Sequence, residues 1–161
     1  MLYLSDEHKQ AIEAHGEEGY PDEICGFLVG SSAEDVRTVT RLVRIENTWD
    51  DNGAPEFAEA GDAFAKESRR RRFKIPPDEY YSADREARAR GEAILGFYHS
   101  HPDHPARPSQ YDLALAREIF PGYSYIIVAI HNARAVDMTS WVLRDDYTQF
   151  DAETVGAAPH A

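Results

Sequence analysis

The chain has 161 residues, a length that suits a single domain with one hydrophobic core. Its 17 basic and 29 acidic side chains give a formal net charge of -12, and because such a surface repels phosphate backbones, we expect no nucleic-acid binding. The single cysteine, Cys25, excludes an intramolecular disulfide and a cysteine-rich zinc ribbon, so a transition metal would have to use histidine and carboxylate ligands.

The N-terminal segment MLYLSDEHKQ has neither the basic region nor the long apolar core of a signal peptide. No stretch of the chain approaches the ~20 consecutive apolar residues of a membrane span. We therefore expect a cytoplasmic protein without membrane contact. Ser5 is placed to cap a helix over residues 6–18, which Gly19 and Pro21 would end.

Two strands and a long loop are predicted next. Residues 24–30, ICGFLVG, form a short apolar run, and residues 35–47 alternate in the manner of a half-buried strand, so together they predict a hairpin. Residues 48–72 show no clear period and predict a long surface loop. Within this loop, the basic run Arg69 to Arg72 is either a solvated edge or a contact for an acidic partner or nucleic acid, and the acidity of the chain favours the solvated edge.

Strands and helices alternate in the second half of the chain. The predicted elements are a strand over 73–75, a helix over 76–92, strands over 93–100, 123–131 and 135–143, and a helix over 109–120. Pro77 and Gly91 mark the start and end of the first of these helices. Residues 146–161 lose the apolar pattern, so we expect a loose C-terminal tail after a domain formed by residues 1–145. This order predicts an α/β fold with about five or six strands and three helices.

Two histidines, His99 and His101, end a predicted buried strand. Because successive strand residues point to opposite faces, the two share one face about 6.6–6.8 Å apart along the strand, while Ser100 points away. Asp112 follows in the first turn of the next helix, where the helix dipole favours an ionised carboxylate. Two histidines and one carboxylate form the ligand set of a catalytic Zn²⁺ whose fourth position holds water.

Each part of this pattern also has a purely structural interpretation. Ser109 and Asp112 have the spacing of a capping box, and two histidines at a strand end can simply be hydrogen-bonded residues. Their joint occurrence on a strand, a proline-broken loop and a helix start favours the metal site. Cys25 is more typical of a buried thiol than of a group beside a metal, and His104 in the loop is either exposed or a substrate contact.

The segment HSHPDHPARPSQYD, residues 99–112, resembles the signature of the JAMM (MPN-plus) metallopeptidases: His-Ser/Thr-His, seven residues, Ser, two residues, Asp. The upstream sequence EICG, which begins at Glu23, is similar to the glutamate motif of the same family. The resemblance spans roughly residues 4–143 and is strongest to the prokaryotic stand-alone branch. It implies a single MPN/JAMM-type domain with a mixed central sheet flanked by about three helices.

The resemblance implies a role for each residue of the motif. His99, His101 and Asp112 would hold Zn²⁺ as metal ligands. Glu23 would accept a proton from the attacking water and pass it to the leaving amine, and Ser109 would donate a hydrogen bond to the tetrahedral oxyanion.

The implied activity is cleavage of an amide or isopeptide bond after the C-terminal Gly-Gly of a ubiquitin-like or sulfur-carrier protein. The implied partner is such a carrier protein of the β-grasp type. A zinc peptidase acting on other short peptides and a non-catalytic MPN scaffold that binds protein partners are the alternatives. Scaffold members usually lack one or more of the metal ligands, and this chain has all of them.

Overall fold

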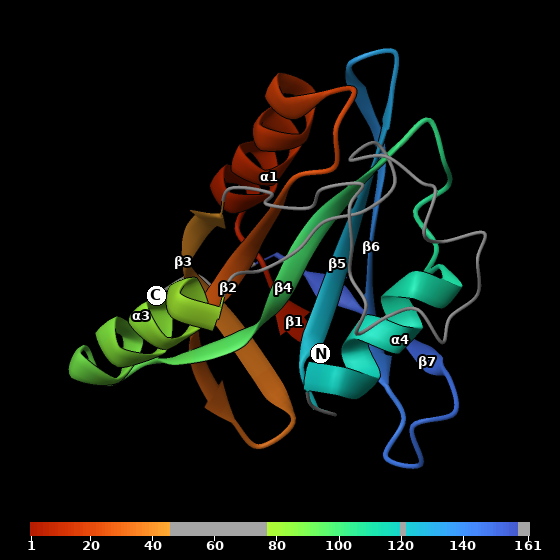
Figure 1. Ribbon diagram of the computed structural model, residues 1–161. Helices are drawn as coiled ribbons and strands as arrows, with labels where there is room; N and C mark the ends of the chain where they lie inside the picture. Colours follow the sequence, from red (N-terminus) through yellow and green to blue (C-terminus); the bar gives the residue numbers. More distant parts are fainter. Residues whose placement is uncertain (46–76, 120–121, 158–161) are drawn as a thin grey trace.

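The computed structural model describes residues 1–45, 77–119 and 122–157 (Figure 1). The predicted loop over 48–72, with its basic run, and the predicted strand over 73–75 lie outside the described residues. The strands are β1 (Leu2–Tyr3), β2 (Cys25–Ala33), β3 (Val36–Ile45), β4 (Ala93–Pro102), β5 (Ser124–His131), β6 (Arg134–Leu143), β7 (Phe150–Glu153) and β8 (Val155–Gly156). The helices are α1 (Asp6–Gly19), α3 (Pro77–Ala89) and α4 (Gln110–Ile119).

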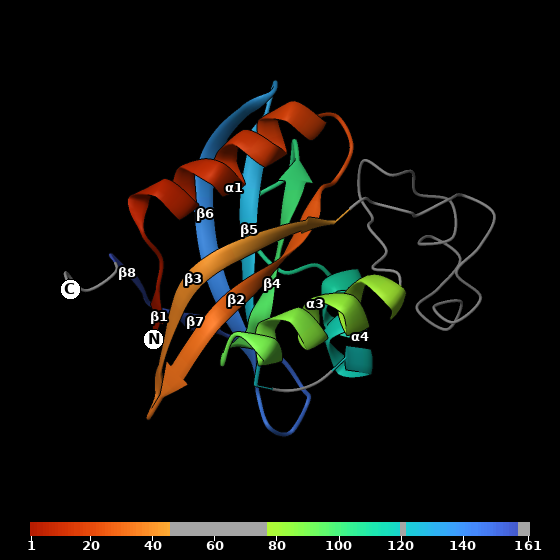
Figure 2. The same cartoon turned by 90° about the vertical axis from the view of Figure 1, so that its left-hand side faces the viewer.

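These strands form one mixed sheet in the order β7-β6-β5-β4-β2-β3-β1-β8. β4 and β5 are parallel, as are the pairs that β1 makes with β3 and β8, and the other pairs are antiparallel. α1 covers one face of the sheet, and α3 and α4 lie on the other (Figure 2). Over the residues described, the predicted α/β fold with three helices flanking a mixed sheet is confirmed, and the sheet has eight strands where about five or six were predicted. Among the described residues, no helix has the length and apolar character that crossing a membrane requires.

Local sequence signals account for the helix ends. The side chain of Ser5 accepts a hydrogen bond from the backbone nitrogen of His8 at 3.1 Å, as an N-cap does, and acidic side chains fill the first turn of α1. Pro77 opens α3, where its missing N–H is not needed. Gly91, with φ of 72°, reverses the chain after α3 in a conformation that glycine adopts without strain.

The core lies on both faces of the sheet. On the face covered by α1, the buried apolar residues include Ile12, Leu28, Tyr98, Ile126 and Val128. On the face covered by α3 and α4, they include Phe27, Ala83, Phe97, Ala116 and Tyr125. Burying a large apolar side chain contributes roughly 1.5–3 kcal/mol, so the two clusters hold the helices in place from both sides. β4 contributes to both clusters because its side chains alternate between the faces.

The C-terminal segment joins the two edges of the sheet. β7 pairs with β6, β8 pairs with β1, and only Thr154 separates these two short strands. The backbone nitrogen of Leu2 donates to the carbonyl of Thr154 at 3.0 Å, and that of Leu4 donates to the carbonyl of Gly156 at 2.9 Å. Residues 150–156 therefore differ from the loose tail expected for residues 146–161. Two short strands give too little alternation to be predicted from sequence.

Candidate metal centre

The site begins at the end of β4, which carries His99 and His101 on the same face of the sheet. Both side chains are buried, and their Nε2 atoms lie 3.1 Å apart. β4 pairs with β2 as far as His99 and with β5 through Pro102, and the backbone nitrogen of Ser100 donates to the carbonyl of Ile24. A strand held on both sides fixes the backbone that carries the two imidazoles.

Asp112, in the first turn of α4, completes a compact cluster with the histidines. Its Oδ1 lies 3.1 Å from Nε2 of His99, and its Oδ2 lies 3.0 Å from Nε2 of His101. Ligands bound at 2.0–2.2 Å in a tetrahedron lie about 3.3–3.6 Å from one another. The three side chains are therefore spaced almost as they would be around one small cation, and their nitrogen and oxygen atoms are donors that Zn²⁺ accepts.

A backbone carbonyl in the loop after β4 orients His101. The Nδ1 atom of this histidine lies 2.8 Å from the carbonyl oxygen of Pro105, which can only accept, so Nδ1 carries the proton. Nε2 is thereby the nitrogen available to a metal. Metal-ligating histidines typically donate a hydrogen bond from the ring nitrogen that does not bind the metal, because this bond fixes the tautomer and the ring orientation.

Asp112 is held by a capping box at the start of α4. The backbone nitrogen of Ser109 donates to Oδ2 of Asp112 at 2.8 Å, and the backbone nitrogen of Asp112 donates to Oγ of Ser109 at 3.0 Å. The capping and the metal interpretations of this motif are therefore compatible, because the same carboxylate makes both sets of contacts. The hydroxyl of Ser109 accepts in this arrangement, so its own proton is left to donate elsewhere.

Charges within the cluster oppose the effect of burial. Burial disfavours the carboxylate of Asp112, but the two neighbouring histidines outweigh it and hold the pKa of this carboxyl below its usual range. Burial lowers the pKa of His99 more than Asp112 raises it. In His101, the hydrogen bond and charge of Asp112 and the Pro105 carbonyl outweigh burial and raise the pKa. The cluster thus keeps an ionised carboxylate beside imidazoles, and a metal would compete with protons for their Nε2 atoms.

Glu23 lies beside this cluster, although it is far from the other three residues in sequence. It lies two residues before Cys25, the first residue of β2, and Cys25 pairs with His99 across the sheet. The Glu23 side chain is buried, and one of its carboxylate oxygens lies within 4.8 Å of the ligand nitrogens of His99 and His101. The structure therefore brings together a carboxylate and two histidines that are about 75 residues apart in sequence.

The other residues singled out from the sequence have structural surroundings. Cys25 is fully buried, and burial raises the pKa of its thiol well above the usual range, as expected for an inert core cysteine. Ser100 points away from the cluster, where its Oγ accepts a hydrogen bond from the backbone nitrogen of Ile24. His104 is half-buried in the loop, and its carbonyl oxygen lies 3.3 Å from Nε2 of His131 at the end of β5.

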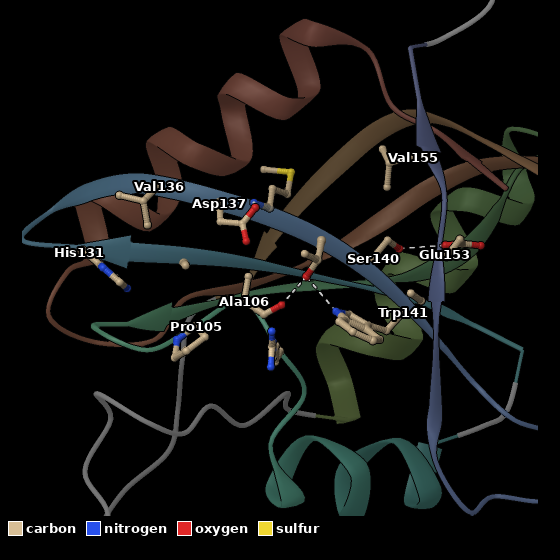
Figure 3. Close-up of a pocket in the computed structure, with 14 residues that line it drawn as sticks. Pro105, Ala106, His131, Val136, Asp137, Ser140, Trp141, Glu153 and Val155 are labelled. Carbon is tan, nitrogen blue, oxygen red and sulfur yellow. Dashed lines mark hydrogen bonds between the residues drawn. The ribbon is translucent and has the colours of Figure 1, made fainter.

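The loop after β4 is also pinned to β6, at the rim of an open groove of about 930 Å³ (Figure 3). Oγ1 of Thr139 donates to the carbonyl of Ala106 at 2.6 Å, and the indole nitrogen of Trp141 donates to Oγ1 of Thr139 at 2.8 Å. These bonds stabilise the loop that presents the Pro105 carbonyl to His101.

Sequence reasoning missed three residues that support the site: Tyr20, Asp103 and Pro105. The hydroxyl of Tyr20 donates to Oδ2 of Asp103 at 2.6 Å and so joins the segment that carries Glu23 to the loop after β4. Asp103 has a positive φ of 57° and is fixed by its own contacts with β5 and with the turn after it. The one sequence signal was the composition of the loop, since aspartate tolerates the left-handed region better than most residues.

The fold and the site together define an α/β domain of the JAB/MPN type, with a candidate metal centre formed by two histidines and an aspartate. The chain belongs to the family of prokaryotic homologs of the JAB domain, whose model matches residues 5–144.

Relatives in sequence and in structure agree with this assignment. The chain is 32% identical over 130 residues to a desampylase from Haloferax volcanii, and the alignment covers 78% of each chain. It is similar to a protein from Salinibacter ruber (36% identity, TM-score 0.68, 99% of this chain and 95% of that one) and to a protein from Desulfitobacterium hafniense (27%, TM-score 0.76, 99% and 94%). A JAB1/MPN domain protein from Archaeoglobus fulgidus, at 19% identity, shares the fold (TM-score 0.52, 97% of both chains).

Proposed function

We propose that this protein is a zinc-dependent hydrolase that cleaves an amide or isopeptide bond after the C-terminal Gly-Gly of a ubiquitin-like or sulfur-carrier protein. The observation that carries the proposal is the convergence of His99, His101 and Asp112, with Glu23 within 4.8 Å of the histidine nitrogens. The similarity to a desampylase supports the substrate class, since that name denotes removal of a ubiquitin-like modifier.

In this proposal, His99, His101 and Asp112 hold the ion. When bound, zinc supplies a Lewis acid that activates water at neutral pH and polarises the scissile carbonyl. The protein contributes the ligand geometry, the Pro105 carbonyl that orients His101 and the capping box that holds Asp112. A non-catalytic scaffold would need none of this arrangement, so the geometry favours an enzyme.

Glu23 is the general base and acid of the proposed reaction. A carboxylate oxygen within 4.8 Å of the ligand atoms lies at a distance that one water molecule bridges. Glu23 would take a proton from the attacking water and deliver it to the leaving amine. The hydroxyl of Ser109 would donate a hydrogen bond to the developing oxyanion, while its oxygen continues to cap α4.

The substrate is tested with a β-grasp carrier protein extended by a peptide beyond its terminal Gly-Gly. Zinc-loaded protein should release the extension after the second glycine, and replacing that glycine by a bulky residue should abolish cleavage. Mass spectrometry locates the cut, and a chelator followed by zinc addition shows that the activity depends on the metal. Equal cleavage of unrelated peptides would replace the carrier assignment by a general peptidase, and zinc-loaded protein that cleaves nothing would indicate a binding scaffold. A cytoplasmic location for this reaction stays a prediction from the sequence.

A further inference from the structure

The segment that carries Glu23 belongs to no helix or strand. α1 ends at Gly19 and β2 begins at Cys25, so residues 20–24 form a short connection with a turn bond from the nitrogen of Asp22 to the carbonyl of Gly19. Neither a helix nor a sheet ladder fixes the backbone of Glu23. Other contacts must therefore set the position of its carboxylate relative to the metal ligands.

The downstream end of this segment is bound to Ser100, the residue between the two histidine ligands. The backbone nitrogen of Ser100 donates to the carbonyl of Ile24 at 3.1 Å, and the backbone nitrogen of Ile24 donates to Oγ of Ser100 at 2.9 Å. Ser100 is completely buried, so water does not compete for these bonds. Ser100 thus holds Ile24, the residue next to Glu23. The neighbours of Ser100 in β4, His99 and His101, point to the metal site.

The upstream end of the segment is bound to the loop that follows the ligand strand. The hydroxyl of Tyr20 donates to Oδ2 of Asp103 at 2.6 Å. Asp103 is itself anchored, because its backbone nitrogen donates to the carbonyl of Ile130 at 2.7 Å and its Oδ1 accepts from the backbone nitrogen of Asn132 at 3.2 Å. Both ends of the Glu23 segment are therefore tied to residues within two positions of His101.

We propose that Ser100 and Asp103 form a two-point clamp that positions Glu23 for catalysis. This inference rests on the proposed role of Glu23 as general base. A misplacement of about 1 Å in a catalytic group can reduce the rate by about 10²-fold, so holding the segment at both ends has a direct effect on turnover. Ser100 and Asp103 are positioning residues in this proposal, because their bonds act on the segment that carries Glu23.

Amide hydrogen exchange in the zinc-loaded protein tests the clamp without using activity. In Ser100→Ala, the amide of Ile24 loses its acceptor and should exchange about five- to tenfold faster, while the amide of Leu28 in the neighbouring strand β2 keeps its rate. Ser100→Thr, which retains the hydroxyl, should restore protection. Ser140→Ala is the matched control, because Ser140 is also buried and bonds only to the distant Glu153 among the contacts described. Unchanged exchange at Ile24 in Ser100→Ala would overturn the clamp.

Kinetics then test whether the clamp acts through Glu23. Ser100→Ala should keep its zinc and its KM but lose about ten- to a hundredfold in kcat, and Tyr20→Phe should lose a few-fold. In a Glu23→Gln background, the same substitutions should cause no further loss, because the group they position is gone. An equal loss in both backgrounds would show that Ser100 acts independently of Glu23 and would overturn the positioning role. If the wild-type protein cleaves no carrier, the proposed function fails, whereas the exchange result still decides whether the clamp exists.

Discussion

The two faces of β4 carry buried polar side chains in different arrangements. On the face toward α1, Tyr98 meets His15, whose Nδ1 lies 2.9 Å from the tyrosine hydroxyl. Burial, and then the charge of Arg44, lower the pKa of His15 to about 4, so this histidine is neutral at pH 7. On the other face, the nitrogens of two histidines and both oxygens of Asp112 crowd together within about 3 Å of one another.

This contrast shows that a buried histidine is not by itself a sign of a metal. One imidazole facing one hydroxyl forms a satisfied hydrogen bond, which any protein core can contain. Two imidazoles and a carboxylate crowded at one point form an arrangement that a cation would stabilise. Substitutions on the two faces should therefore differ in their effect on metal binding.

The largest effect is expected at the proposed metal ligands. His99→Ala, His101→Ala and Asp112→Ala should each lose most of the bound zinc and nearly all hydrolysis, because each removes a group that we propose to hold the metal. His15→Gln is the control from the opposite face and should retain one zinc per chain. Elemental analysis of the purified variants gives the stoichiometry, and full zinc in both histidine ligand variants would disprove the site.

A slightly smaller effect is expected at Glu23. Glu23→Gln should retain zinc and fold but lose on the order of 10²–10⁴ in turnover, since an amide does not accept the proton. Steady-state kinetics together with zinc analysis separate a lost base from a lost metal. Wild-type turnover in this variant would place the general base on another residue.

Ser109 should show two separable effects. Ser109→Ala should lower the free energy of unfolding by about 1 kcal/mol through the lost cap and lower turnover by about 10²–10³-fold through the lost oxyanion contact. Ser5→Ala is the matched control, because Ser5 caps α1 in the same way but lies on the other face of the sheet. It should lose similar stability at full turnover. If the two variants lose turnover equally, Ser109 acts only as a cap.

The smallest effect concerns the pH dependence of stability at His15. Its pKa is about 4 in the folded protein and about 6.5 in an unfolded chain, so below pH 6.5 the unfolded state binds a proton that the folded state does not. Stability should therefore fall as the pH falls from 6.5 toward 4. With allowance for solvent screening, we expect a loss of about 1 kcal/mol between pH 7 and pH 5, or about 2–4 °C in Tm.

Thermal melts of the wild type and of His15→Gln over this pH range check the prediction. The variant keeps an acceptor for the Tyr98 hydroxyl but cannot be protonated, so its melting temperature should change less with pH. The same slope in both proteins would mean that other groups produce the dependence.

Much of the fold could be predicted because its signals are local. The Ser5 cap, the alternation along β3 and the apolar run of β4 each depend on a few neighbouring residues. β1, β7 and β8 were not predicted, since two to four residues give no usable period and their partners lie far away in the chain. Pairing between distant segments depends on how the sheet curves, which no short window of sequence contains.

The sequence by itself was enough to predict that His99 and His101 share one face of a strand and that Asp112 lies at a helix start, because strand alternation and the capping box are local signals. The sequence also has a glycine at position 26, Gly26, but it does not show why a glycine is required there. Only the tertiary structure shows that a Cβ at this position would lie 2.2 Å from the ring of Tyr98, which crosses β2 here on the face toward α1. Likewise, only the folded chain brings Glu23 to the histidines and ties its segment to Ser100 and Asp103. The physical reason is that these contacts join segments about 80 residues apart, and their geometry exists only once the sheet and its two cores have formed.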